Sequence, residues 1–468
     1  MRLFVPLLFL LMGALRAQEE KSQTAPDPLL TVHASPKPLS ASAITADWPR
    51  FLGPNDNAAS PETCLIDSFP ETGPVLLWEL EKEESFTCPA IADGRLVYFQ
   101  NISDQDVVEC RHPETGKLFW SQRYPNPYRD RYGYGKGPRV APVLSQGRVF
   151  TLSATSQLHC FDLQTGSIVW RRDLGAEYNP GPYFFGHGTS PLVLGNALIL
   201  PIGGKGVAVA AFDAATGKTL WESRHEWTAG YASPVIANFH GKTRILVFAG
   251  GDSKPPTGGL LCIDPQTGRI DDAFSWRSAK YESVNASTPL VLPGNRVLIS
   301  ETYTEGGVLL GITEAFKLDP IWKAPELKLH FMTPLSIDGH LYAFTGRNEP
   351  DAGLDCWDAA TGTRKWRQEF FWKKQIDNRS FGWSFFRGTL LHVDRKVLAL
   401  GELGTLAFLD LSPEKGKIVC QADLFSAQQS WVLPAVSHGL LYVVQNQPDL
   451  VTGKPPRLLC YDFRKAGK

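Results

Sequence analysis

The sequence has almost no net charge. Its 468 residues carry 47 lysines and arginines against 48 aspartates and glutamates, which gives a formal charge of −1. A chain with no excess of either sign has no long-range field that would gather nucleic acid or an anionic membrane surface. We therefore expect neither as a partner.

Long apolar stretches are also missing beyond the first 15 residues. Residues 3–15 are apolar, follow a single basic residue, Arg2, and are too few to span a bilayer, which takes about 20 residues. Ala17 then offers a small residue at a cleavage position. The pattern predicts a secretory signal peptide over 1–17 and no membrane span, so we expect a periplasmic or extracellular protein.

Familiar catalytic motifs are absent too. The chain has no Gly-x-Ser-x-Gly, no His-Glu-x-x-His and no phosphate-binding loop. The sequence therefore gives no support for an α/β-hydrolase, a zinc peptidase of that type or a P-loop nucleotide-binding protein.

What the chain does contain is a repeated unit. In residues 160–170 the recurring positions are held by Asp162, Thr165, Gly166 and Trp170. The unit returns, with His replacing Asp in one copy, at residues 110–120, 211–221 and 356–366. Self-similarity at a period of about 50 residues is typical of propellers and solenoids.

The unit has the chemistry of a β-hairpin. The Asp162 carboxylate can accept hydrogen bonds from backbone amides just after it, and Gly166 can adopt the positive φ that reverses the chain. Trp170 follows on a strand with period-two alternation, so it is expected to be buried as a contact between neighbouring sheets. The tryptophans assigned to this slot are Trp78, Trp120, Trp170, Trp221, Trp276, Trp322 and Trp366.

A second element, a proline followed by a short apolar strand and a turn glycine, fixes the number of units. It occurs eight times between Pro89 and Pro434, with Trp383 replacing proline in one copy. We predict an all-β fold, an eight-bladed β-propeller of four-stranded antiparallel blades, over residues 47–468. The strand near 75–80 is expected to complete the last blade and close the ring, and the Ser-, Ala- and Pro-rich residues 18–46 to form a flexible linker.

The repeat pattern resembles the tryptophan-docking motif of quinoprotein dehydrogenases, eight-bladed propellers that use pyrroloquinoline quinone (PQQ) and calcium. The same repeat occurs in non-enzymatic relatives such as BamB, the propeller lipoprotein of the outer-membrane barrel assembly machine. The opening Trp-Pro-Arg-Phe-Leu-Gly-Pro at 48–54 is similar to the start of many exported PQQ-like repeat proteins.

The resemblance leaves two functions open. The chain lacks the adjacent cysteine pair and the Cys-x-x-Cys-His haem segment of the family's best-known alcohol dehydrogenases, and it is shorter than they are. This favours a monomeric, non-catalytic exported scaffold that binds a protein, peptide or glycan at its rim or channel mouth, without a cofactor. The alternative is a PQQ- and calcium-dependent oxidoreductase that acts on an alcohol or a sugar.

Candidate binding residues lie just before the inner strands, where the segments mix aromatic, glycine and polar residues. We expect a pocket at the channel mouth formed by Arg139, His187, Tyr231, Asn285, His330, Trp383 and Trp431. Glu282 and Asn285 offer oxygen ligands for a hard cation. The same residue types would also serve only to satisfy inward-facing backbone groups. The repeated cysteines are expected in the core, and Cys64 and Cys88 are left as a candidate disulfide.

Overall fold

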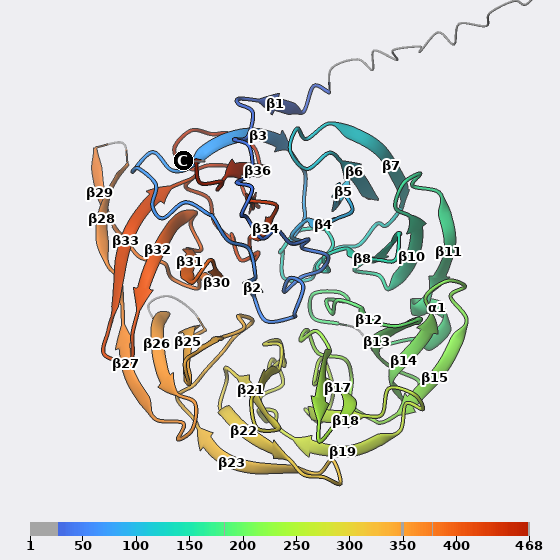
Figure 1. Cartoon of the computed structure of the whole chain (residues 1–468). Helices are drawn as coiled ribbons and strands as arrows, with labels where there is room; N and C mark the ends of the chain where they lie inside the picture. The colour runs from blue at the N-terminus through green and yellow to red at the C-terminus, as the bar shows by residue number, and fades with distance from the viewer. Residues whose placement is uncertain (1–26, 182, 348–350, 377, 467–468) are drawn as a thin grey trace, which may run out of the picture.

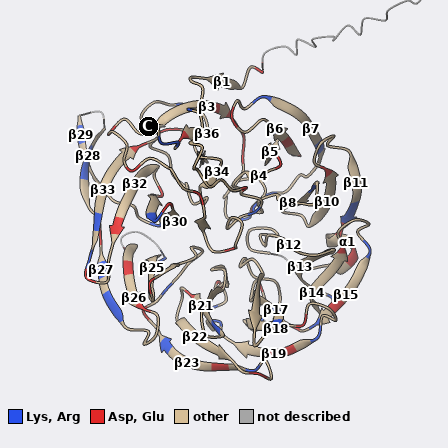
Figure 2. Ribbon diagram, viewed as in Figure 1, with Lys and Arg blue, Asp and Glu red and all other residues tan. Residues whose placement is uncertain are grey.

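The structure is a computed structural model that describes residues 27–181, 183–347, 351–376 and 378–466. Its strands form a closed ring of eight antiparallel four-stranded blades around a central channel, as predicted (Figure 1). In each blade a short inner strand faces the channel and successive strands step outward. Acidic and basic residues both occur around the outer strands (Figure 2).

The first four blades follow chain order from the channel outward. Blade 1 comprises β4 (Ala90–Ala92), β5 (Arg95–Ile102), β6 (Gln105–Arg111) and β7 (Leu118–Pro125). Blade 2 comprises β8 (Val143–Ser145), β9 (Arg148–Leu152), β10 (Gln157–Asp162) and β11 (Ile168–Asp173). Blade 3 comprises β12 (Leu192–Leu194), β13 (Ala197–Gly204), β14 (Val207–Asp213) and β15 (Thr219–Arg224). Blade 4 comprises β16 (Val235–Phe239), β17 (Lys242–Ala249), β18 (Gly259–Ile263) and β19 (Ile270–Ser275).

The last four blades complete the ring. Blade 5 comprises β20 (Leu290–Leu292), β21 (Arg296–Glu301), β22 (Gly306–Ile312) and β23 (Leu318–Ala324). Blade 6 comprises β24 (Leu335–Ile337), β25 (His340–Thr345), β26 (Gly353–Asp358) and β27 (Arg364–Gln368). Blade 7 comprises β30 (Thr389–Val393), β31 (Lys396–Leu400), β32 (Thr405–Leu411) and β33 (Gly416–Asp423). Blade 8 comprises β34 (Ala435–Ser437), β35 (Leu440–Gln445), β36 (Arg457–Asp462) and β3 (Val75–Glu81).

The ring closes through strand β3, which comes from the N-terminal part of the chain. It pairs antiparallel with β36, and Trp78 lies opposite Cys460. The predicted closure is therefore confirmed. The elements outside the eight blades include the short helix α1 (Leu174–Tyr178) and the hairpin formed by β28 (Trp372–Ile376) and β29 (Arg379–Trp383). No helix in the described ranges is long and apolar enough to cross a membrane.

Neighbouring blades are joined by tryptophan docking. The indole N–H of Trp120 donates to the backbone carbonyl of Leu163, in the turn of the next blade, at 2.9 Å. Gly166 of that turn has φ of 72° and lies under the ring, because an added Cβ would come within 2.5 Å of the indole. Equivalent hydrogen bonds to the next blade are made by Trp78, Trp170, Trp221, Trp322 and Trp366.

Blade 4 departs from this pattern: Trp276 contacts the next blade as predicted, but it does not hold the register position of the other docking tryptophans. The strand register places Asp272, not Trp276, opposite Cys262. Trp276 follows the end of β19 and donates instead to the carbonyl of Gly306 on β22, at 2.9 Å. The Asp272 carboxylate adds a second contact between the blades, since it accepts the backbone N–H of Leu318 at 2.8 Å.

The prediction of a flexible linker is wrong for residues 27–46, which pack against blade 8. Strand β1 (Leu30–Val32) pairs with β3 and so covers the outer edge of blade 8. Further along, the backbone N–H of Lys37 donates to the Asp462 carboxylate at 3.0 Å. An exposed edge strand has unpaired backbone groups, and the segment satisfies them. The predicted signal peptide, 1–17, and residues 18–26 lie outside the described residues.

The chain then enters the channel (Figure 1). Trp48 is fully buried and exchanges backbone hydrogen bonds with Ile91 of β4, at 2.9 and 2.8 Å. Strand β2 (Ala59–Ser60) next runs parallel to β30 of blade 7. This segment therefore fills part of the channel and links blades 1 and 7, which lie on either side of blade 8.

The cysteines do not form disulfides. All eight lie within the described residues and all are free, so the candidate pair Cys64 and Cys88 is not joined in this structure. Those at the repeated position, such as Cys160 and Cys262, are buried core residues as expected.

Loss of one docking tryptophan should destabilise the whole ring. We expect Trp78→Ala to lower the free energy of unfolding by about 3–5 kcal/mol, the usual cost of removing a buried aromatic side chain. Val419→Ala, on the exposed face of β33, is the control and should change it by less than about 0.5 kcal/mol. Denaturant unfolding measures both values. A loss below about 1 kcal/mol for Trp78→Ala would contradict the docking role.

Candidate functional site

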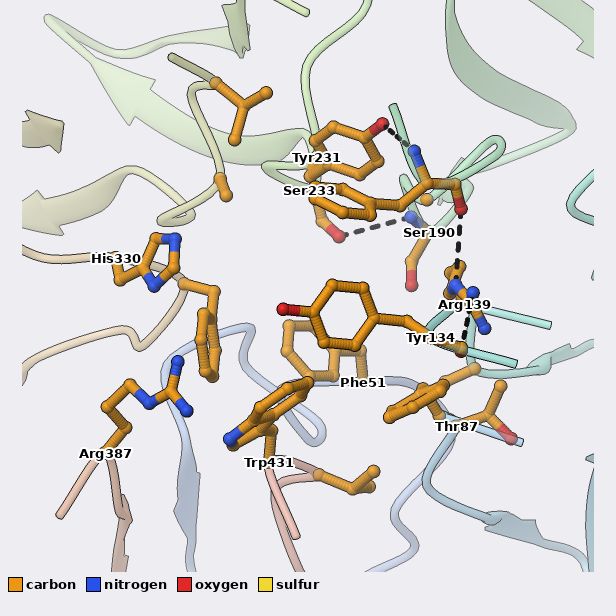
Figure 3. A pocket seen from close by; sticks show the side chains of 18 of the residues that line it. Phe51, Thr87, Tyr134, Arg139, Ser190, Tyr231, Ser233, His330, Arg387 and Trp431 are labelled. Atoms are coloured by element: carbon orange, nitrogen blue, oxygen red, sulfur yellow. Dashed lines mark hydrogen bonds between the residues drawn. The ribbon is translucent and has the colours of Figure 1, made fainter. Parts of the chain in front are cut away.

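A cavity of about 320 Å³ opens at the channel end where the chain leads into the inner strands. Aromatic side chains from segments that lead into six different blades make up much of its wall. Figure 3 shows Tyr134, Tyr231 and Trp431 among them. We call this site the aromatic bowl and define it by the rings of Phe86, Tyr134, Phe185, Tyr231, Phe331 and Trp431.

The rings of the bowl form one continuous series of contacts. Tyr231 packs on Phe185 with centroids 5.7 Å apart, and Phe185 packs on Tyr134 at 5.6 Å. Trp431 continues the series, 5.8 Å from Tyr134 and 5.7 Å from Phe331. Segments far apart in the sequence are thus brought together because the ring aligns the starts of all its inner strands.

Arg139 fixes the loop that carries Tyr134. Its guanidinium donates to the backbone carbonyls of Tyr134 at 2.9 Å and Phe185 at 3.2 Å, and it pairs with Asp130 at 3.3 Å (Figure 3). It also lies over the ring of Phe86, 4.8 Å from the centroid. Arg139 is therefore a positioning residue whose donors are largely used within the protein.

The same loop is anchored at its start by a buried polar network. The Asp106 carboxyl accepts hydrogen bonds from the side-chain amides of Asn101 at 3.0 Å and Asn126 at 2.8 Å. Burial raises the pKa of Asp106 to about 7, although the two amide donors lower it. Asn126 is fully buried at the point where the chain leaves blade 1 for the bowl.

A second charged pair supports Trp431. The Arg387 guanidinium lies 4.9 Å from the Trp431 centroid and pairs with the Glu402 carboxylate, its Nε at 3.0 Å. The indole N–H of Trp431 donates to the same carboxylate at 2.7 Å. Glu402 is nearly fully buried, so its charge is balanced locally by Arg387.

His330 and Arg347 form the remaining wall of the bowl. The Arg347 guanidinium lies over the ring of Tyr303, 4.4 Å from its centroid. The Nδ1 atom of His330 is buried and has no hydrogen-bond partner among the described residues. Burial, aided by Arg387 and Arg347, lowers the pKa of His330 to about 3, so the ring is neutral at pH 7.

Four of the seven predicted channel-mouth residues line the bowl: Arg139, Tyr231, His330 and Trp431. His187 lies outside it. Both of its ring nitrogens are used, Nδ1 with the Ser156 hydroxyl at 3.0 Å and Nε2 with the Pro201 carbonyl at 3.0 Å. Asn285 is also buried, and its side-chain N–H groups donate to the carbonyls of Ala249 and Trp276. These two residues satisfy inward-facing backbone groups and a neighbouring hydroxyl.

The prediction that Trp383 lies at the channel mouth is wrong for a different reason. It ends β29, in the extra hairpin, and its indole N–H donates to the Thr405 hydroxyl at 3.3 Å. The inner strand β30 begins only after Gly388, and the turn that follows it lies at Asp394 and Arg395, both with positive φ. The inserted hairpin displaces Trp383 from the position that proline holds in other blades.

The predicted cation ligands are not assembled into a site. Glu282 is exposed, whereas Asn285 is fully buried. Within the described ranges, no three His, Cys, Asp or Glu residues are grouped so that they could hold a metal ion.

Several bowl residues were not selected from the sequence. Tyr134, Phe185 and Phe331 stand in the same pre-strand segments as the chosen residues, where aromatic character was the available signal. Arg347 and Glu402 instead follow β25 and β31, the second strands from the channel in blades 6 and 7. These strands run antiparallel to the inner strands and therefore end at the same mouth.

The bowl does not fit a quinone bound together with calcium. Calcium takes about six to eight oxygen ligands. The Glu402 carboxylate, which contacts a ring of the bowl, is already bound by Arg387 and Trp431. The aromatic faces would accept a planar group, but the donor set offers no cluster of free oxygen ligands for the metal.

The pH dependence of stability should report the Asp106 network. Folded Asp106 keeps its proton up to about pH 7, whereas the unfolded residue loses it near pH 4. Between these values the folded state binds more protons, so this contribution to stability falls as pH rises. We expect Asp106→Asn to flatten the loss of Tm between pH 4 and 7, and the exposed control Asp319→Asn to retain it. Equal pH profiles for Asp106→Asn and the wild type would contradict the network.

Comparisons with known proteins agree on the fold. The family model described as outer membrane protein assembly factor BamB matches residues 104–368. The outer membrane protein assembly factor BamB of Bordetella pertussis (strain Tohama I) is 22% identical over 303 residues, which cover 63% of this chain and 68% of that protein.

Solved structures of both functional classes are similar. BamB from Moraxella catarrhalis has a TM-score of 0.54 at 12% identity, covering 84% of this chain and 100% of its own. A europium-containing methanol dehydrogenase has a TM-score of 0.60 at 10% identity, covering 89% and 98%. Quinohemoprotein alcohol dehydrogenase from Comamonas testosteroni has a TM-score of 0.59 at 13% identity, covering 92% and 82%.

At these identities the solved structures show the fold alone, and enzymes and BamB share it. The family model goes further, because its match spans more than half of the chain. The chain belongs to the family of PQQ-like repeat propellers described as outer membrane protein assembly factor BamB.

Proposed function

We propose that this chain is an exported, non-catalytic scaffold that holds a segment of a protein partner in the aromatic bowl. The family is named for a factor in the assembly of outer membrane proteins, so a protein of the same compartment is the partner that suits it. Export is supported by the signal-peptide pattern over 1–17. We propose that the scaffold acts as a monomer, because the ring closes on itself without help from another chain.

The observation that carries this proposal is the chemistry of the bowl surface. Its framework charges pair with one another: Arg139 with Asp130, and Arg387 with Glu402. What faces the cavity is mainly aromatic surface, held in place by the ring and by these pairs. Rigid aromatic side chains are enriched in protein interfaces, where they give large contact areas at low entropic cost.

The bowl is less suited to acid–base catalysis. A histidine whose pKa lies near 3 is a weak base at neutral pH, and His330 is the one histidine among the described residues of the cavity wall. The Glu402 carboxylate is held by an arginine and an indole and is not free to accept a substrate proton. These features favour binding over the oxidoreductase alternative.

The bowl is also open to a large partner. Tyr132 and Tyr134, on the loop between blades 1 and 2, are 52% and 37% exposed. Their rings contact Phe185 with centroids 5.4 and 5.6 Å apart. A segment approaching along the channel axis would therefore meet aromatic side chains first. Sugar rings also stack on such side chains, so the experiment must identify the occupant.

Site-specific photo-crosslinking tests the proposal in the exporting cell. A photoreactive phenylalanine analogue at Tyr132 should give a discrete protein adduct, identified by mass spectrometry, that is reduced in a Phe331→Ala background. The same analogue at Leu220, exposed on the outer strand β15, is the control and should not give this adduct. An identical adduct from both positions, an adduct with glycan, or none from Tyr132 would contradict protein binding in the bowl.

A further inference from the structure

The wall of the bowl formed by His330 and Arg347 differs from the rest because its arginine is not ion-paired with a carboxylate of the described residues. In the described part of the chain Arg139 and Arg387 each have a carboxylate partner, whereas Arg347 has none. Its guanidinium lies over the Tyr303 ring, and its N–H groups donate to no other group in the described part of the chain. The nearest acidic groups among the described residues on this side are Glu301, whose carboxylate accepts backbone N–H groups of the following turn, and the exposed Glu282, and neither is ion-paired with Arg347.

Beside this cation is a polar atom that the fold leaves without a partner. His330 Nδ1 is buried, and no described group is within hydrogen-bonding reach. Buried polar side-chain atoms are normally hydrogen-bonded, so an unsatisfied atom in a cavity wall indicates a position for a ligand atom. Figure 3 shows the His330 ring facing the cavity beside Arg387 and opposite the Tyr134 hydroxyl.

The neighbouring wall is apolar. Phe331 follows His330 directly, and its ring packs 5.7 Å from Trp431, which in turn lies 5.8 Å from Tyr134. An aromatic side chain could pack edge-on or offset against these rings. A guanidinium and an imidazole next to three aromatic rings thus define two adjoining subsites of different chemistry.

We infer that the bowl recognises an anionic and aromatic determinant, with a carboxylate beside Arg347 and His330 and an aromatic side chain against Tyr134, Phe331 and Trp431. The inference rests on the proposed function and names the chemistry of the partner segment. Arginine binds carboxylates through charge-assisted hydrogen bonds, which are stronger than neutral ones. The carboxylate comes from an acidic side chain or from the end of a chain.

Short peptides can test this chemistry on the purified full chain. The probes are acetyl-Asp-Phe-amide, its neutral analogue acetyl-Asn-Phe-amide, and acetyl-Phe with a free terminal carboxylate, each titrated by calorimetry. We expect a carboxylate probe to bind about tenfold more tightly than the neutral analogue, the factor for one charge-assisted hydrogen bond. Tighter binding of acetyl-Asp-Phe-amide would identify a side-chain carboxylate as the ligand, and tighter binding of acetyl-Phe would identify the carboxylate at the end of a chain.

Variants separate the anion subsite from the fold. Arg347→Gln should remove the preference for the carboxylate, and Arg347→Lys should keep part of it, because a charge remains. Arg224→Gln, on the exposed outer strand of blade 3, is the matched control and should bind as the wild type does. Thermal unfolding of each variant confirms that the ring is intact.

Two results would overturn the inference: equal affinity for the acidic and neutral probes, or an unchanged preference in Arg347→Gln. Neither affects the proposed function, since a bowl that binds neutral aromatic peptides remains a protein-binding site. If none of the probes binds while Phe331→Ala still reduces the cellular adduct, the inference alone fails. An adduct unaffected by Phe331→Ala would overturn the proposed function itself.

Discussion

The contact on which the structure depends is the packing of a tryptophan onto the turn of the next blade. Trp120 shows its parts: an indole N–H bonded to the Leu163 carbonyl, and a ring that covers Gly166. Each blade alone would expose the outer edge of a small sheet, so it gains stability mainly from its neighbours. Because Trp78 comes from the start of the chain and docks like the others, the contact also closes the ring.

Ring closure explains why an aromatic cavity forms at the channel mouth. The inner strands are short and point the same way, so the segments that precede them meet around one axis. Those segments are not alike: some end in aromatic side chains, and others supply arginines that hold loops in place. Arg139 and Arg387 show this second role, since each pairs with a carboxylate and lies against a ring of the bowl. The cavity is thus organised by contacts within the chain itself.

The fold was predictable because the repeat encodes local and global structure at once. Asp162, Gly166 and Trp170 specify a turn, a strand face and a blade contact within nine residues. The site was predicted only in part, because repeats give position along the chain but not side-chain direction. His187 and Asn285 hold the expected positions and turn into the protein. Insertions cause the other errors: the β28–β29 hairpin moves Trp383 away from the channel, and a shifted tryptophan leaves Asp272 in the docking slot of blade 4.

The central claim is that the channel mouth is a binding surface for a partner segment and not a quinone–calcium centre. Calorimetric titration of the purified chain with PQQ, in calcium and in chelator, tests it most directly. The aromatic and arginine side chains of the bowl do not bind calcium. We therefore expect the same heat of titration with PQQ in calcium and in chelator. Saturable one-to-one binding of PQQ that requires calcium would contradict the account and favour the oxidoreductase.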